Sequence, residues 1–400
     1  MSTFDLQLLK KEIEDELVNN ILPFWMEHTV DKNFGGFYGY MTNDQEVNKE
    51  ADKGCILNSR ILWSYSKAFN QLKDPKYLEI ADHAFDYLKN HFLDQEHGGI
   101  YWMLDYKGQP SEDRKHIYNQ SFGIYGLTEY YMATKNKESL KLAIDLYQLI
   151  EKYAYDQENK GYLEAFTRDW KADEDLRLSG KDLNTAKSMN THLHILEAYT
   201  NLYRVWKDEA FKEKLIELID VTLEHIVSDQ YQFKLFFDEE WNSKSDVISY
   251  GHDIEGSWLL HEAAEVVGDE QLIHKVEEVA IKMAKKVLED GIDQDGSVMN
   301  ELDGDHLDKD KVWWVQAEAV VGFFNAYQLT ADQAYLDAVD QLWTFTKTYI
   351  IDQKSGEWFW KRDANLEIDS NMPKVDPWKC PYHNSRFCYE MIERINKVTS

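Results

Sequence analysis

The 400-residue chain has few of the residues that interrupt or cross-link a fold, with only six prolines and three cysteines. No stretch rich in Pro, Gly or Ser divides it, so we expect residues 1–400 to form a single domain. The three cysteines, Cys55, Cys380 and Cys388, are odd in number and lack the spacing of a zinc site. Neither a disulfide framework nor a structural zinc ion is therefore expected.

Long apolar runs and positive charge are also scarce. No stretch approaches the roughly 18 apolar residues of a membrane-spanning helix. The segment from Met1 to Lys10 carries early charges and has the pattern of an amphipathic helix rather than of a signal peptide. Lys and Arg number 44 against 73 Asp and Glu, a net charge of −29 that disfavours nucleic acid and anionic membranes as partners. We expect a cytoplasmic protein with neither kind of partner.

Aromatic residues, in contrast, are abundant at 14% of the chain, including 13 Trp and 24 Tyr. Many must lie in the core, which a hydrophobic fraction of 43% makes large. Trp and Tyr are also the side chains on which the apolar faces of sugar rings stack. The composition is therefore typical of a globular protein with a small-molecule sugar as its partner.

A short aromatic turn recurs near residues 36, 99, 161, 234, 296 and 356, at steps of 63, 62, 73, 62 and 60 residues. The extra residues of the third step lie in a charged, loop-like run between Asp169 and Lys187. Such self-similarity indicates an architecture of repeated units.

Each interval holds two segments with helical periodicity. The expected helices span residues 4–20, 52–70, 75–91, 115–134, 137–153, 187–206, 209–228, 250–267, 269–290, 311–330, 333–350 and 379–397. One pair is split between the two termini, which favours closure of the repeats into a ring. The predicted fold is all-α, an (α/α)6 barrel of six inner and six outer helices, with the first helix after each turn inside.

Every expected inner helix carries a polar or aromatic residue in its early part, and closure would bring these residues to one mouth of the barrel: Arg60, Tyr118, Asn190 with His194, His252, Trp314 and His383. Helix N-termini at that mouth favour developing negative charge. We expect only one of Trp313 and Trp314 to face the barrel axis.

Two histidines facing one carbon atom could remove a proton from one face and return it to the other, because imidazole both accepts and donates protons near neutral pH. This is the chemistry of an epimerase. Other interpretations remain open: His194 as a core histidine, Arg60 as a buried ion-pair partner, and Glu255 as the group that orients His252. We interpret His192 as structural or supporting. The remaining histidines are predicted to lie at the surface: His28, His83, His91, His97, His116, His225, His261, His274 and His306.

A metal site built from His252, Glu255, His194 and His383 is conceivable. The chain has no His-Glu-x-x-His motif, however, and no close cluster of ligands within one segment. We therefore predict neither a metal ion nor another cofactor.

Five strings resemble cellobiose 2-epimerases of the N-acylglucosamine 2-epimerase superfamily: residues 51–63, 189–197, 249–255, 313–318 and 378–384. The similarity spans nearly the whole chain, and its motifs are specific only jointly. It implies an (α/α)6 barrel that converts the reducing-end glucose of a β-1,4-linked disaccharide to mannose without a cofactor.

The resemblance also implies roles for individual residues. His252 and His383 would form the acid/base pair, while Arg60 and His194 would hold the carbonyl oxygen of the open-chain sugar. The remaining predicted contacts to the sugar are Tyr118, Asn190 and Glu255 at hydroxyl groups, and Trp314 and Trp378 stacked on the rings.

Three other functions remain open from the sequence. A monosaccharide 2-epimerase or mannose isomerase would share the fold and the histidines. An (α/α)6 inverting glycoside hydrolase would need two carboxylates roughly 6.5–9.5 Å apart, and Glu255 and Glu318 lie on expected inner helices. A non-catalytic sugar-binding protein would need no titrating histidines.

Overall fold

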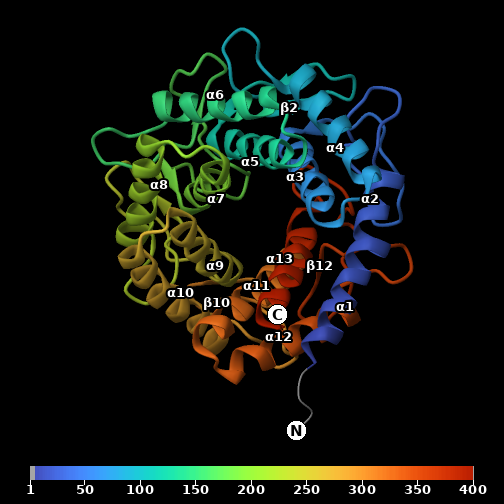
Figure 1. Ribbon diagram of the computed structural model, residues 1–400, viewed down its shortest axis with the longest axis vertical. Helices are drawn as coiled ribbons and strands as arrows, with labels where there is room; N and C mark the ends of the chain where they lie inside the picture. Colours follow the sequence, from blue (N-terminus) through green and yellow to red (C-terminus); the bar gives the residue numbers. More distant parts are fainter. Residues whose placement is uncertain (1–4, 400) are drawn as a thin grey trace.

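A computed structural model describes residues 5–399 of the chain as two concentric rings of helices (Figure 1). The inner helices are α3 (Cys55–Leu72), α5 (Ile117–Thr134), α7 (Met189–Val205), α9 (Tyr250–Val267), α11 (Trp313–Thr330) and α13 (Tyr382–Thr399). The outer ring comprises α1 (Leu6–Glu16), α2 (Leu22–His28), α4 (Pro75–Tyr87), α6 (Lys137–Tyr153), α8 (Glu209–Val221), α10 (Glu270–Asp290) and α12 (Gln333–Phe345). The predicted (α/α)6 barrel is confirmed, and the first helix after each turn is the inner one.

The ring closes between its first and last repeats. Each inner helix packs against the next, and α13 contacts α3 as well as α11. Helix α1 packs against α13, so the N-terminal helix supplies the outer partner of the last inner helix, as expected. Residue 4, where that helix was expected to begin, lies outside the described residues. Within residues 5–399, no helix is both long enough and apolar enough to cross a membrane.

Outer helices begin and end in a regular way. Asp74, Asn136, Asp208 and Asp269 each accept a backbone N–H in the first turn of α4, α6, α8 and α10, the usual role of an N-cap residue. Several outer helices widen into π-helical turns, at Leu17–Ile21, Leu88–Phe92, Thr222–Ile226 and Thr346–Ile350.

Five inner helices begin two or three residues later than expected, whereas α9 begins at Tyr250 as expected. A two-residue strand precedes most inner helices and pairs with the chain that follows the next turn. The antiparallel sheets are β1–β2–β3, β4–β5, β6–β7, β8–β9–β10 and β11–β12. The strands are β1 (Lys53–Gly54), β2 (Met103–Leu104), β3 (Pro110–Glu112), β4 (Lys115–His116), β5 (Ala165–Phe166), β6 (Lys187–Ser188), β7 (Phe236–Phe237), β8 (Ile248–Ser249), β9 (Glu301–Asp303), β10 (His306–Asp308), β11 (Lys311–Val312) and β12 (Lys361–Arg362). Each pairing fixes the start of an inner helix relative to the next repeat.

A buried ion pair reinforces this link in most repeats. In the first, the Lys53 ammonium at the start of β1 lies 2.7 Å from a carboxylate oxygen of Asp31, at the beginning of the preceding turn. Equivalent pairs join Lys115 to Asp94, Lys187 to Asp156, Lys311 to Asp293 and Lys374 to Asp352. The ion pair holds the recurring aromatic turn to the strand before the inner helix of the same repeat, in addition to the strand pairing with the next repeat.

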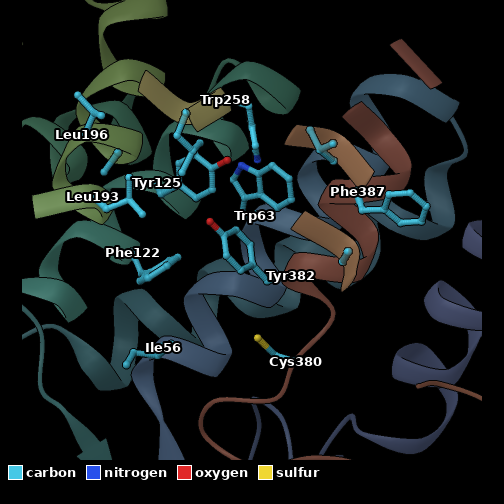
Figure 2. Close-up of a cluster of buried hydrophobic side chains, with 14 of the residues drawn as sticks. Ile56, Trp63, Phe122, Tyr125, Leu193, Leu196, Trp258, Cys380, Tyr382 and Phe387 are labelled. Atoms are coloured by element: carbon cyan, nitrogen blue, oxygen red, sulfur yellow. The ribbon is translucent and has the colours of Figure 1, made fainter. Parts of the chain in front are cut away.

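Buried hydrophobic side chains of the inner helices, several of them aromatic, pack together in the core (Figure 2). Trp63 and Tyr125 stack with ring centroids 5.0 Å apart. The Tyr382 ring packs edge-on against Phe122 at 5.3 Å and against Trp63 at 5.6 Å. This packed core turns the mouth into a blind pocket.

Candidate active site

One cavity of about 190 Å³ lies at the mouth and is lined by all nine residues predicted as site residues: Arg60, Tyr118, Asn190, His194, His252, Glu255, Trp314, Trp378 and His383, with Trp313 and Trp360 in addition. They come from all six inner helices and from the segment before α13. Their convergence confirms the geometric expectation, while their chemical roles stay predictions.

His383 is held by a carboxylate from another helix. Its Nδ1 lies 2.6 Å from Oε1 of Glu318 on α11, and 3.9 Å from Oε1 of Glu255 on α9. With Nδ1 bound in this way, Nε2 is the nitrogen left for the pocket. Burial, with the charges of Arg60 and Arg386, lowers the pKa of His383 well below its usual value. The imidazole is therefore neutral near pH 7 and able to accept a proton.

Arg386, one turn beyond His383 on α13, ties the surrounding carboxylates together. Its guanidinium contacts Glu255 at 2.5 Å and Glu318 at 2.6 Å, and it also pairs with Glu197. All four side chains are almost completely buried. Burial raises the pKa of Glu318 and of Glu255 to about 7, although Arg386 opposes the shift. One arginine thus links α7, α9, α11 and α13 beneath the pocket.

His194 has a carboxylate partner on its own helix. Its Nδ1 lies 2.9 Å from Oε2 of Glu197, whose other oxygen accepts hydrogen bonds from Tyr382 and Arg386. Burial raises the pKa of Glu197, but Arg386 and the hydrogen bond from His194 outweigh it and leave the pKa at about 2. Glu197 is therefore an anion, and His194 belongs to the site as well as to the core.

His252 has a neutral partner instead. A 2.7 Å hydrogen bond joins its Nδ1 to the hydroxyl of Ser249. Glu255 is bound by Arg386, and no hydrogen bond or ion pair between Glu255 and His252 occurs among the described residues. The interpretation that Glu255 orients His252 is therefore wrong: a guanidinium holds the carboxylate elsewhere. Burial, with His194, lowers the pKa of His252 to about 3.

Arg60 lies in the pocket wall without a carboxylate partner in residues 5–399. It donates to the Tyr118 hydroxyl at 2.8 Å and to the Trp378 carbonyl at 3.2 Å, and its guanidinium lies over the Phe122 ring at 4.2 Å. The interpretation of Arg60 as a buried ion-pair partner is therefore wrong. A positive charge with no protein anion beside it is suited to bind an oxyanion in the cavity.

Trp314 contacts both candidate acid/base residues. Its ring centroid is 4.8 Å from that of His252 and 5.4 Å from that of His383. Trp313 also lines the cavity and packs edge-on against His383 at 5.4 Å. The expectation that only one of the two tryptophans faces the axis is therefore wrong, because His383 approaches from α13 and meets both rings.

Ligand atoms of Glu255, Glu318 and His383 lie within 4.8 Å of one another, a grouping that could attract a metal ion. Arg386 already places its guanidinium against both carboxylates. A metal ion there would have to displace a buried cation, so these residues do not fit a metal centre.

Two further cavities adjoin the pocket beside the loop formed by residues 171–186. Groove 1, of about 310 Å³, shares Trp378 with the pocket and includes Trp102, Met103 and Pro377. Groove 2, of about 400 Å³, shares Asn190 and His252 with it and is mainly polar. Loop residues 177–179 line both grooves. The charged insertion of the third repeat therefore divides the approach to the pocket.

Predictions for the other histidines are partly wrong. His116 and His261 are buried, not at the surface: Nδ1 of His116 caps α5, and Nδ1 of His261 contacts Oδ1 of Asn325 at 3.0 Å. His192 is structural as interpreted, since its Nε2 accepts the backbone N–H of Tyr162 at 2.9 Å.

Sequence reasoning missed the buried network of Glu318, Arg386 and Tyr382, and the lining residue Trp360. Two signals were available: Arg386 follows His383 by three residues, and Glu318 follows Trp314 by four, so each shares a helix face with a predicted site residue. Charged residues on an otherwise buried face require partners.

The site thus defines an (α/α)6 barrel with histidines, carboxylates and an unpaired arginine around a blind pocket. The model of the N-acylglucosamine 2-epimerase (GlcNAc 2-epimerase) family matches residues 36–384, and the chain belongs to this family. It is 48% identical to a cellobiose 2-epimerase of Bacteroides fragilis, over 96% of this chain and 99% of the relative. It is 46% identical to that of Dictyoglomus turgidum, over 98% of this chain and 100% of the relative.

A solved cellobiose 2-epimerase from Bacillus thermoamylovorans has the same fold. It superposes with a TM-score of 0.93 at 44% identity, covering 97% of this chain and 100% of that one.

Proposed function

We propose that this protein is a cofactor-independent 2-epimerase that interconverts the reducing-end glucose and mannose of β-1,4-linked disaccharides, converting cellobiose to glucosyl-mannose. The observation that carries the proposal is that His252 and His383 line one cavity and both pack against the Trp314 ring. Identity of 46–48% to cellobiose 2-epimerases over nearly the full length of the chain supports the substrate class.

The first step removes the proton from C2 after the sugar ring has opened. The C1 aldehyde acidifies the C2–H bond. The electron pair of that bond forms the C1–C2 double bond, while the π electrons of the carbonyl move to O1 and give an enediolate. One neutral histidine accepts the proton at Nε2. Arg60 and His194 stabilise the charge on oxygen, and Arg60 is suited to this role because no carboxylate of the described residues neutralises it.

The second step returns a proton to the opposite face of C2 from Nε2 of the other histidine, which therefore has to carry a proton there when the sugar is bound. The negative enediolate raises the proton affinity of that histidine, which burial and neighbouring charges otherwise lower. Each positioned proton transfer contributes roughly 10²–10⁴ in rate. Return of the proton to C1 instead would give a 2-ketose, so aldose–ketose isomerisation is an expected side reaction.

The second sugar ring requires space beyond the pocket. Trp378 lies at the boundary of the pocket and groove 1, where it contacts Trp102 at a centroid distance of 6.1 Å. We assign the outer ring to the face of Trp378, with Tyr118, Asn190 and Glu255 at the hydroxyls of the inner sugar. Residues 1–400 would act as one catalytic domain.

Incubation with cellobiose in heavy water tests this function. An epimerase incorporates deuterium at C2 and yields a mannose-containing disaccharide, a hydrolase releases monosaccharide, and a binding protein leaves the sugar unchanged. We expect His252→Ala and His383→Ala each to abolish inversion at C2, with retained folding checked by circular dichroism. Near-parental rates for both variants would exclude the assignment. Preference for free glucose or mannose over cellobiose would instead support a monosaccharide 2-epimerase or mannose isomerase.

A further inference from the structure

The fourth repeat, which carries His252, departs from the others at the two residues before its inner helix. Four of the five strands that immediately precede an inner helix begin with a buried lysine: Lys53, Lys115, Lys187 and Lys311. In β8 the equivalent residue is Ile248. The acidic partner is missing as well, since Ser228 makes the turn contact that Asp31 and Asp293 make in their repeats. Both members of the ion pair are therefore replaced together.

The next residue also behaves differently. Ser188 in β6 accepts the backbone N–H of Thr191 and so caps α7. Ser249 holds the same position before α9, but its side chain makes no cap and contacts Nδ1 of His252 at 2.7 Å instead. A serine that precedes a helix usually caps it, because free backbone N–H groups are there to be satisfied. The Ser249 side chain therefore bonds to the imidazole of His252 and not to a backbone N–H of α9.

We propose that Ile248 and Ser249 position His252 for proton transfer. The Ser249 hydroxyl accepts a hydrogen bond from Nδ1–H of His252, which keeps the lone pair of Nε2 free for the C2 proton of the sugar. Ile248 keeps a cation out of the place where the other repeats hold a lysine. The inference rests on the proposed function.

In the third repeat, the lysine at this place is one of the groups that lower the pKa of a neighbouring histidine. His192 on α7 has a pKa lowered to about 3, chiefly by burial and further by Lys187. The titratable and charged groups that line a cavity with His252 are, in the pocket, Arg60, Tyr118, His194, Glu255 and His383, and, in groove 2, Glu164, Arg177, Lys181, Asp182, Glu301 and Asp303. His383 is the second proposed acid/base residue. An additional fixed cation nearby would lower the proton affinity of both His252 and His383.

Two sets of variants test the proposal. We expect Ser249→Ala to lower kcat by about tenfold or more, with KM changed less than about twofold, and Ser249→Thr to recover most of the activity.

Ile248→Lys combined with Ser228→Asp restores the ion pair. We expect it to move the alkaline limit of the kcat/KM profile to lower pH, because a nearby cation makes the histidine pair lose its proton sooner. Ile248→Met is the neutral control and should keep the parental limit.

Ser188→Ala separates positioning from folding. It should lower the midpoint of thermal unfolding through loss of a helix cap, whereas Ser249→Ala should leave that midpoint nearly unchanged. The proposal is overturned if Ser249→Ala lowers the midpoint as much as Ser188→Ala does and keeps the parental kcat and pH profile. It is also overturned if the restored ion pair leaves the alkaline limit in place. Activity retained by His252→Ala would contradict the proposed function itself, whereas an inactive His252→Ala with parental Ser249 variants would contradict this inference alone.

Discussion

At the scale of single residues, two buried arginines show how partners decide function. Arg386 pairs with carboxylates from α7, α9 and α11, so its charge is used to hold the network together. Arg60 contacts a hydroxyl, a carbonyl and aromatic rings, and its charge remains available to the pocket. The same residue type is therefore structural in one place and suited to oxyanion binding in the other.

Glu318→Gln tests the support of His383. The amide keeps the shape of the side chain but removes the carboxylate 2.6 Å from Nδ1, which is partly ionised near pH 7 because its pKa is about 7. A hydrogen bond to a charged group contributes about 1.5–3 kcal/mol, so we expect kcat to fall roughly 10- to 100-fold. Steady-state kinetics with cellobiose measure this, and thermal unfolding controls for the fold. An unchanged kcat would show that the carboxylate does not assist His383.

At the scale of elements, the repeat is stabilised by a strand, a turn and an ion pair at the mouth. Asp31 accepts from the Lys53 ammonium and also from the backbone of Asn33 and Phe34 in the turn. Lys53 additionally donates to the carbonyl of Gly35. The pair therefore connects an aromatic turn to the first residues of an inner helix, on which the orientation of pocket side chains depends.

We expect Lys53→Met to lower the free energy of unfolding by about 3–5 kcal/mol, because both side chains of the pair are only 1% exposed and Asp31 would be left as an unpaired buried charge. Urea denaturation measures the change. The double variant Lys53→Met/Asp31→Asn should lose less than the single one, since the uncompensated charge is gone. A single variant as stable as the parent would show that water reaches Asp31 easily.

At the scale of the whole molecule, several histidines are buried in neutral form. His192 accepts from the backbone N–H of Tyr162 at Nε2, and its Nδ1 contacts the Ser188 carbonyl at 2.7 Å. Its pKa is lowered from 6.5 to about 3, chiefly by burial. The unfolded chain therefore binds a proton below pH 6.5 that the folded protein does not bind. Stability should fall as the pH falls from about 6.5 towards 3.

His192→Gln should make this acid loss shallower, by up to about 1.4 kcal/mol for each pH unit in that window. Glutamine is suitable because Gln120 and Gln316 make the same bond to the turn backbone in the second and fifth repeats. Urea denaturation of both proteins between pH 4 and 7 provides the test. Parallel curves would show that His192 takes no part in acid destabilisation.

Local regularities in the chain determine much of the fold of this protein. The recurring turns, the helical periodicity and the pair split between the termini predicted a closed barrel, because each describes contacts between near neighbours in sequence or a simple repetition of them. The early positions of Arg60, His194, His252 and His383 on inner helices predicted a common pocket for the same reason.

Only the tertiary structure decided which partner each of these groups has. Glu318 reaches His383 and Arg386 reaches Glu255 from different helices, and no spacing along the chain specifies such pairs. The burial of His116 and the placement of both Trp313 and Trp314 at the cavity were decided in the same way. Closing the ring brings distant segments together, and the resulting loss of water makes the identity of each neighbour determine charge and proton affinity.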